Sequence, residues 1–197
     1  MKKILFLGYS SKQTSLIDKV RLHEKKWDLK QSQEKINLET AKNFDIIISF
    51  GYQHLIDKNI INNLKCPIIN LHISFLPYNR GAHPNFWSFM ENTPSGITIH
   101  EVDAGIDTGK IIYQNEIDFE LFKNRNILTF SKTYKTLIRE IENLFFANVK
   151  NIINQNFSSV DQKGKGTYHE KKDLPKLLEN WEQNIYKTIL KYKELSK

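Results

Sequence analysis

Three short apolar runs, each followed closely by a glycine or a polar residue, constrain the fold of this chain more than any other feature. They cover residues 3–8, 45–50 and 67–71, and each has the length of one buried β-strand. Apolar residues recur at helical spacing in the intervening segments 11–23 and 55–64. Strands that alternate with helices predict an α/β fold, with a mostly parallel, open, Rossmann-like sheet and flanking helices.

The middle of the chain changes to a different pattern. Residues 96–102 and 110–117 alternate with period two, which predicts two strands that flank the loop 103–109. Residues 126–154 carry apolar side chains at spacings of three and four, which predicts one long helix with an apolar stripe that packs on the core.

The C-terminal part begins with a basic loop, Lys163-Gly-Lys-Gly-Thr-Tyr168. From Leu174 onward the apolar residues again follow helical spacing, which predicts a helical tail: Leu177, Leu178, Trp181, Ile185 and Ile189. We therefore expect one main catalytic domain over 1–160, and a basic loop and C-terminal helix over 161–197 packed on it.

Composition excludes several classes of protein. The single cysteine, Cys66, excludes an internal disulfide and every multi-cysteine metal site. No apolar run approaches the roughly 20 residues that a membrane-spanning helix needs, and the apolar start is too brief for a signal peptide, so we expect a cytoplasmic protein and no membrane partner. The net charge of +7, from 29 basic and 22 acidic residues, favours an anionic partner. No arginine-rich block accompanies it, so we expect no nucleic acid partner.

Three polar side chains follow the predicted strands at places where ligands commonly bind. Asn70 and His72 lie at the carboxyl end of the run 67–71, and ligands of open α/β sheets bind outside such ends. Asp107 lies between Gly105 and Gly109. An amide that holds an oxyanion, an imidazole that moves a proton and a carboxylate that orients both suit acyl transfer to an amine.

Each of these residues also has a structural interpretation when it is taken alone. Asn70 can simply form a strand-terminal turn, and a single histidine such as His72 is more often structural than catalytic. Asp107 can cap a glycine-rich turn. It is their joint occurrence that favours a functional site.

Two motifs contain these residues in order. Asn-Leu-His-x-Ser-x-Leu-Pro with a following Arg-Gly covers 70–81, and Gly-x-Thr-x-His-x-x-Asp-x-Gly-x-Asp-x-Gly covers 96–109. With these motifs the chain resembles the folate-dependent formyltransferases, which include glycinamide ribonucleotide formyltransferase, the catalytic domain of methionyl-tRNA formyltransferase and the sugar N-formyltransferases. The resemblance is strong from about residue 45 to 114 and looser out to residues 2 and 168.

The resemblance implies a mechanism in which an amine attacks the formyl carbon of N10-formyltetrahydrofolate. Asn70 donates to the formyl oxygen as it becomes an oxyanion, and His72 stabilises that charge or moves a proton between the two nitrogens. Asp107 pairs with His72 and helps to remove the proton of the attacking ammonium. His100 is expected to support this group, or else to be a satisfied strand histidine. No metal is expected.

The resemblance also implies binding residues. It places the pterin between the loops 51–56 and 102–107, with these residues as the cofactor-binding set: Tyr52, Gln53, His54, Leu55, Ile56, Val102, Asp103 and Gly105. For Gln53 and His54 plain exposure to solvent remains open. The expected acceptor-binding residues are Tyr78, Asn79, Arg80 and His83, although Tyr78 and Asn79 are equally explained by a turn between Pro77 and Gly81.

Departures from the relatives narrow the acceptor. The segment 8–15 lacks the glycine-serine phosphate loop of the glycinamide ribonucleotide enzymes, and the short tail cannot form the barrel domain of the tRNA enzymes. Segments 79–87 and 166–169 resemble the small sugar formyltransferases. We therefore expect a nucleotide-linked amino-deoxy sugar of the kind used in surface glycans as substrate.

Other functions stay open at this point. The acceptor could be another amine, such as an amino acid, a peptide or glycinamide ribonucleotide, or the protein could be a folate-fold binding module without turnover. Asn70 also comes early in the chain, which predicts a shortened N-terminal half and leaves the outer wall of the folate pocket in question. A homodimer could form through Phe145, Phe146 and the helix that is expected around Trp181.

Overall fold

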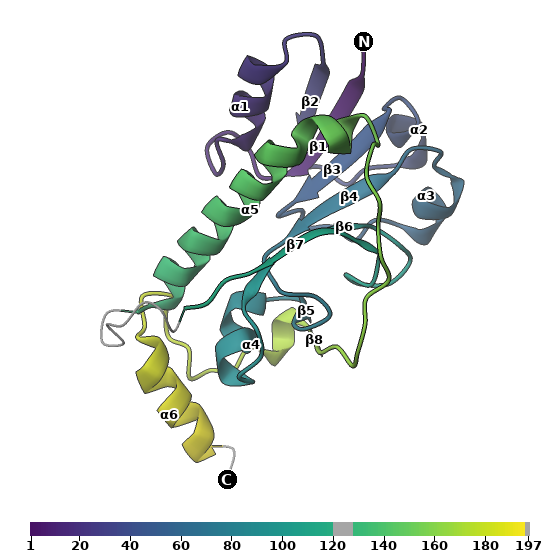
Figure 1. Ribbon diagram of the computed structural model, residues 1–197. Helices are drawn as coiled ribbons and strands as arrows, with labels where there is room; N and C mark the ends of the chain where they lie inside the picture. Colours follow the sequence, from purple (N-terminus) through teal and green to yellow (C-terminus); the bar gives the residue numbers. More distant parts are fainter. Residues whose placement is uncertain (120–127, 196–197) are drawn as a thin grey trace. The chain divides into compact units, whose positions relative to one another are not determined.

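The computed structural model describes residues 1–119 and 128–195 (Figure 1). The chain divides into two units, each assembled from discontinuous segments. Unit 1 comprises 1–72, 99–113 and 142–162, and unit 2 comprises the described residues within 73–98, 114–141 and 163–197. The division expected from the sequence, between a catalytic domain 1–160 and a tail 161–197, stays a prediction.

A six-stranded sheet has the strand order β2-β1-β3-β4-β6-β7. Its strands are these: β1 Lys3–Gly8, β2 Asp28–Ser32, β3 Ile46–Phe50, β4 Ile68–His72, β6 Gly96–Glu101 and β7 Ile111–Glu116. Strand β1 pairs in parallel with both β2 and β3, and β3 pairs in parallel with β4. The α/β class and the mostly parallel sheet predicted from the sequence are confirmed.

The helices of unit 1 begin where a side chain or a turn provides for their free N–H groups. Helix α2, Leu38–Ala41, starts after Asn37, whose side chain accepts from the Thr40 amide, and α3, Lys58–Asn63, starts after Asp57 in the same way. Helix α1 covers Leu16–His23, later than the predicted start at residue 11, because residues 10–14 form a hydrogen-bonded turn.

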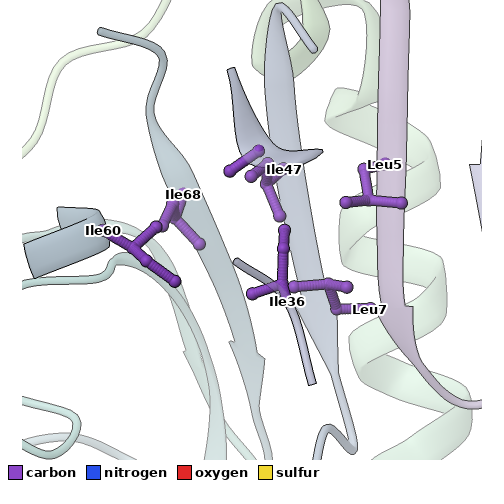
Figure 2. Packing of buried hydrophobic residues seen from close by; sticks show 7 residues of the cluster. Leu5, Leu7, Ile36, Ile47, Ile60 and Ile68 are labelled. Atoms are coloured by element: carbon purple, nitrogen blue, oxygen red, sulfur yellow. The ribbon is translucent and has the colours of Figure 1, made fainter. Parts of the chain in front are cut away.

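The central strands are apolar on both faces because both faces are covered. On one face a cluster joins the strands to α2 and α3 (Figure 2): Leu5, Leu7, Ile36, Ala41, Ile47, Ile60 and Ile68. Alternate residues of β1 and β3, such as Ile4, Phe6 and Ile48, are buried on the other face. There the Phe6 ring meets Phe145 edge-on at 6.1 Å between centroids. Phe145 is therefore core, and its predicted place on a dimer surface is wrong.

Removing a side chain from this cluster should destabilise the protein strongly. Ile47 is fully buried, so we expect Ile47→Ala to lower the free energy of unfolding by about 2–5 kcal/mol, since it leaves a cavity between strand and helices. Leu22 is 77% exposed and provides the control. Urea unfolding should find Leu22→Ala within about 0.5 kcal/mol of wild type. Equal losses for the two variants would contradict this account of the core.

The long helix α5 covers Phe130–Ile153 and confirms the predicted apolar stripe. Buried apolar side chains recur along it at spacings of three, four and seven: Phe130, Leu137, Ile141, Phe145, Val149 and Ile152. The first two residues of the predicted helix, 126 and 127, lie outside the described residues. The helix contributes residues 130–141 to unit 2 and its remainder to unit 1. Within the part of the chain that the structure describes, none of the helices combines the length and apolar character needed to cross a membrane.

Unit 2 contains helix α4, Pro84–Met90, the two-stranded pairing of β5, Arg80–Gly81, with β8, Tyr168–His169, and helix α6, Ile185–Leu195. The helix predicted from Leu174 begins only at Ile185, so Trp181 does not lie on it. The backbone before α6 makes other hydrogen bonds: Ser131 N–H donates to the Trp181 carbonyl, and Asn180 accepts from the Glu182 amide. The segment before Ile185 is irregular although its apolar residues have helical spacing, and the spacing alone could not distinguish it from a helix.

Candidate active site

Three polar side chains of unit 1, those of Asn70, His72 and His100, meet around Asp107. Its Oδ1 accepts a hydrogen bond of 3.2 Å from Asn70 Nδ2 and lies 3.4 Å from His100 Nε2, and its Oδ2 lies 3.7 Å from His72 Nε2. Asn70 Nδ2 is also 3.2 Å from His100 Nε2. The three residues that the sequence suggested for catalysis are thus brought together, with His100 in the same group.

The sheet itself determines this grouping. Asn70 and His72 are two apart on β4, so their side chains project on the same side of the strand. His100 comes from β6, the next strand of the sheet, and the Val102 amide that follows donates to the Ile68 carbonyl at 2.8 Å. Adjacent parallel or antiparallel strands lie less than about 5 Å apart, which is why these polar ends converge.

Asp107 is held by the loop between β6 and β7. Its backbone has a φ of 52°, in the left-handed region that aspartate tolerates. Within the loop, Asp103 accepts from the Thr108 hydroxyl at 2.6 Å and from the Gly105 amide at 3.0 Å. From outside the loop, the Gln162 side chain donates to the carbonyls of Asp107 and Gly109, both at 2.8 Å. The carboxylate is therefore presented by a loop that is tied at several points.

Hydrogen bonding indicates which nitrogen of His100 carries its proton. The Glu101 carbonyl, 2.8 Å from Nδ1, can only accept, so Nδ1 donates. In the neutral ring Nε2 is then the acceptor for one N–H of Asn70, and the second N–H of that amide points to Asp107. His100 and Asp107 together fix the amide of Asn70 with its nitrogen on their side.

The group is largely shielded from water. The side chains of His72, His100 and Asp107 are 10%, 2% and 14% exposed. Charge interactions are stronger in such a place than in bulk water, so a carboxylate here can stabilise a proton on an adjacent imidazole. An oxygen that approached Asn70 Nδ2 and became negative would meet a fixed N–H donor. The arrangement can thus support proton transfer and charge stabilisation at one point.

Gln162 is the contact that the sequence interpretation missed. It lies 55 residues after Asp107, in a segment without any periodic pattern, and its side chain donates to two loop carbonyls. A lone glutamine next to a basic loop carries no sequence signal of this kind.

The predicted cofactor loop 51–56 follows β3. The Tyr52 hydroxyl donates to the Glu34 carbonyl at 2.8 Å and accepts from the Ile36 amide at 2.9 Å. Burial raises the pKa of Tyr52 above its ordinary value. Tyr52, Ile56 and Val102 pack partly buried against the apolar cluster of Figure 2. Gln53 and His54 are exposed, as is Leu55 at 77%. Both predicted pterin loops thus border the same cluster; which of their residues bind a pterin stays a prediction.

The Tyr52 hydroxyl makes a specific local prediction. Tyr52→Phe removes the acceptor of the Ile36 amide, so we expect a stability loss of about 1 kcal/mol and faster hydrogen exchange at that amide. Gln53→Ala is the matched control, because Gln53 is exposed and its side chain donates to the Gly51 carbonyl within the same loop. Unchanged protection of the Ile36 amide in Tyr52→Phe would show that the hydroxyl does not hold the segment 34–36.

The predicted acceptor residues Tyr78 and Asn79 lie in a turn of unit 2. The Tyr78 amide donates to the Phe75 carbonyl at 3.1 Å. Asn79 is completely buried with a φ of 56°, and its side chain donates to Thr93 Oγ1 at 2.8 Å. Asn79 is thus used by the fold, which favours the turn interpretation for this residue.

Arg80 and His83 follow in the same segment of unit 2. Arg80 belongs to β5, and His83, with a φ of 55°, precedes α4. The His83 ring lies 5.5 Å from the Trp181 ring between centroids. Burial, and to a smaller degree the nearby Lys171, lowers the pKa of His83. Contact of Arg80 or His83 with an acceptor stays a prediction.

The described residues offer no cluster of side chains suited to a metal ion. Within residues 1–119 and 128–195, no three or more histidine, cysteine, aspartate or glutamate side chains gather in a way that could hold a metal ion. A metal-free reaction stays a prediction.

Solved structures of known proteins share this fold. The crystal structure of the formyltransferase PseJ from Anoxybacillus kamchatkensis, in complex with UDP-4,6-dideoxy-4-formamido-L-AltNAc and tetrahydrofolate, is 38% identical. The likeness covers 96% of this chain and 99% of that one, with a TM-score of 0.84. A likely sugar N-formyltransferase of Mycobacterium tuberculosis, at 22% identity and a TM-score of 0.77 over 98% of this chain and 87% of that one, shares the fold.

Sequence relatives point to the same family. The dTDP-4-amino-4,6-dideoxyglucose formyltransferase of Mycobacterium bovis is 35% identical over 82 residues, 42% of this chain and 34% of that protein. The methionyl-tRNA formyltransferase of Rickettsia felis is 29% identical over 168 residues, 84% of this chain and 53% of that protein. The chain thus spans between a third and about half of these relatives. The α/β sheet and its loops bring an amide, an imidazole and a carboxylate together, an arrangement that suits the chemistry of group transfer. Residues 5–134 match the model of the formyl transferase family, so this protein belongs to that family.

Proposed function

We propose that this protein moves the formyl group of N10-formyltetrahydrofolate to the amine of a nucleotide-linked amino-deoxy sugar. The observation that carries the proposal is the convergence of Asn70, His72 and Asp107 in unit 1. The similarity over 96% of the chain to PseJ, whose crystal structure is a complex with a nucleotide-linked formamido sugar and tetrahydrofolate, supports the choice of donor and acceptor.

The residues suggest how the transfer proceeds. The amine attacks the formyl carbon, and the formyl oxygen gains negative charge that the Asn70 N–H stabilises. Asp107 accepts the proton of the attacking ammonium directly or through His72, whose Nε2 is 3.7 Å from its Oδ2. The attacking nitrogen then loses a second proton, which the folate nitrogen receives as its bond to the formyl carbon breaks and tetrahydrofolate leaves, and the first proton passes from Asp107 to solvent. Atoms and charge then balance without a metal or an oxidant.

The loop after β1 argues against glycinamide ribonucleotide as the acceptor. Gln13 Oε1 accepts from the Ser10 amide at 3.1 Å, from the Ser10 hydroxyl at 3.2 Å and from Gln33 at 3.0 Å. A phosphate at this loop would need such N–H donors for itself. In this structure the Ser10 donors are instead bonded to the side chain of Gln13.

The test is an absorbance assay of tetrahydrofolate release from N10-formyltetrahydrofolate, with a panel of UDP- and dTDP-linked 3- and 4-amino sugars. Release that depends on one of these acceptors, with a formamido product seen by mass spectrometry, supports the proposal. Folate binding without turnover on any sugar would favour another amine. Absence of folate binding would favour a binding module that has lost its donor. We also expect a cytoplasmic protein, which cell fractionation would test, and a homodimer, which light scattering would test.

A further inference from the structure

Two segments of unit 2 that are far apart in the sequence form one small sheet next to Arg80. Strand β5 pairs in parallel with β8, with Arg80 opposite Tyr168 and Gly81 opposite His169. The Arg80 amide donates to the Thr167 carbonyl at 3.0 Å, and the Ala82 amide donates to the His169 carbonyl at 2.8 Å. The backbone on both sides of Arg80 is therefore held by the segment 167–169.

Thr167 adds a side-chain contact just before Arg80. Its hydroxyl accepts a hydrogen bond of 2.8 Å from the backbone N–H of Asn79 and lies 3.4 Å from the side-chain oxygen Oδ1 of the same residue. Asn79 is completely buried and in the left-handed region, so its amide has no access to water as a substitute partner. The hydroxyl of Thr167 is thus a buried partner of the Asn79 backbone N–H.

Gly166 touches the side chain of Arg80 itself. A Cβ placed on Gly166 would be 3.1 Å from the guanidinium carbon of Arg80 and would overlap the Pro77 carbonyl. The guanidinium therefore lies close to residue 166, where a larger residue would collide with the Pro77 carbonyl and would also press on the guanidinium.

The far end of the same segment is anchored on α4. The His169 ring stacks on Trp87 at 3.8 Å between centroids and an interplanar angle of 8°. His169 Nε2 also lies 3.0 Å from Glu91 Oε1, although outside the angles of a hydrogen bond. Segment 166–169 is thus fixed on α4 at one end and on the residues around Arg80 at the other.

We propose that Gly166 and Thr167 are positioning residues that fix the Arg80 guanidinium for the diphosphate of the nucleotide-linked acceptor. This inference rests on the proposed function. A guanidinium binds phosphate oxygens through two parallel N–H donors, and this fork is effective only when its direction is fixed. Backbone pairing and the Thr167 hydroxyl hold the backbone that carries the guanidinium, and Gly166 leaves room for the guanidinium beside it.

The test compares three threonine variants. Thr167→Val keeps the shape and the backbone pairing but removes the hydroxyl, and Thr167→Ser restores it. Thr188→Val is the matched control, since Thr188 is a buried threonine of α6 in the same unit with its hydroxyl bonded to Gln183 and Asn184. We expect Thr167→Val to weaken UDP binding in calorimetry and to raise KM for the acceptor roughly tenfold, as loss of one buried hydrogen bond implies.

In the same variant kcat and the affinity for folate should stay close to wild type, and Thr167→Ser should recover most of the binding. Thr188→Val should lower only Tm. If Thr167→Val also lowers only Tm, Thr167 is structural and the inference is overturned. A double-mutant cycle tests the route: in an Arg80→Ala background, Thr167→Val should have no further effect on UDP affinity. Additive effects would mean that Thr167 does not act through Arg80.

Failure of the proposed function gives a different result. If neither UDP nor dTDP binds the wild-type protein, the nucleotide acceptor is wrong, and Arg80 has no diphosphate to hold. Positioning is then measured on the protein alone, from the NMR signal of the Arg80 Nε–H, assigned with Arg80→Lys. A signal that moves in Thr167→Val but not in Thr188→Val supports the positioning of Arg80, and an unmoved signal overturns it.

Discussion

Asp107→Asn should lower kcat/KM for formyl transfer by about a thousandfold or more, the largest effect that we expect from any single change. The substitution keeps the size of the side chain and can keep one hydrogen bond to Asn70. It removes the charge that faces both histidines, and with it the base that accepts the proton of the attacking ammonium.

The measurement is the pH dependence of kcat/KM for wild type and variant, with folate affinity measured in parallel. Both the rate and the shape of the profile should change, because the proton acceptor is absent from the variant. Asp161→Asn is the matched control. The Asp161 side chain is 86% exposed, and its Oδ1 lies as far as 3.9 Å from the Lys110 Nζ, so this carboxylate makes only a weak ion pair. A profile that Asp107→Asn leaves unaltered in shape would exclude Asp107 from proton removal.

Asn70→Ala should lower kcat by about 100- to 1,000-fold, the usual cost of removing one oxyanion donor. The donor acts mainly in the transition state, so the dissociation constant of folate should change little. The same substitution leaves His100 Nε2 without its amide partner, so a small decrease in Tm is also expected.

Single-turnover kinetics with saturating donor separate these effects. Asn63→Ala serves as the control, because Asn63 is an exposed asparagine of α3 with bonds only to Asn59. His72→Asn should also lose most turnover while folate binding survives. Near-native turnover of either Asn70→Ala or His72→Asn would mean that the roles assigned to these side chains are wrong.

Features that depend on neighbouring residues could be predicted from the sequence. The runs around Phe6, Ile48 and Ile69 are apolar because both faces of a central strand are buried, and this pattern is local. The same holds for the stripe of α5 and for the place of Asn70 and His72 at the end of β4. The short helix α2 was missed, since four residues carry too little periodicity to be recognised.

Other features depend on contacts between distant residues. The tail from Leu174 has helical spacing but is not helical before Ile185, because its backbone bonds to Leu128 and Ser131 instead. Phe145 looks like a candidate for an exposed patch until Phe6 is seen to cover it. Local spacing carries no information about either partner.

The sequence by itself determined the α/β class, five of the six strands of the main sheet and the identity of the amide, imidazole and carboxylate, because these follow from apolar periodicity and from two contiguous motifs. Only the tertiary structure decided that Asp107 lies against Asn70, 37 residues away, and that Thr167 holds Asn79, 88 residues away. Closing such long loops costs entropy that is recovered only when the whole sheet and its neighbours pack. The geometry of the site is therefore a property of the packed chain.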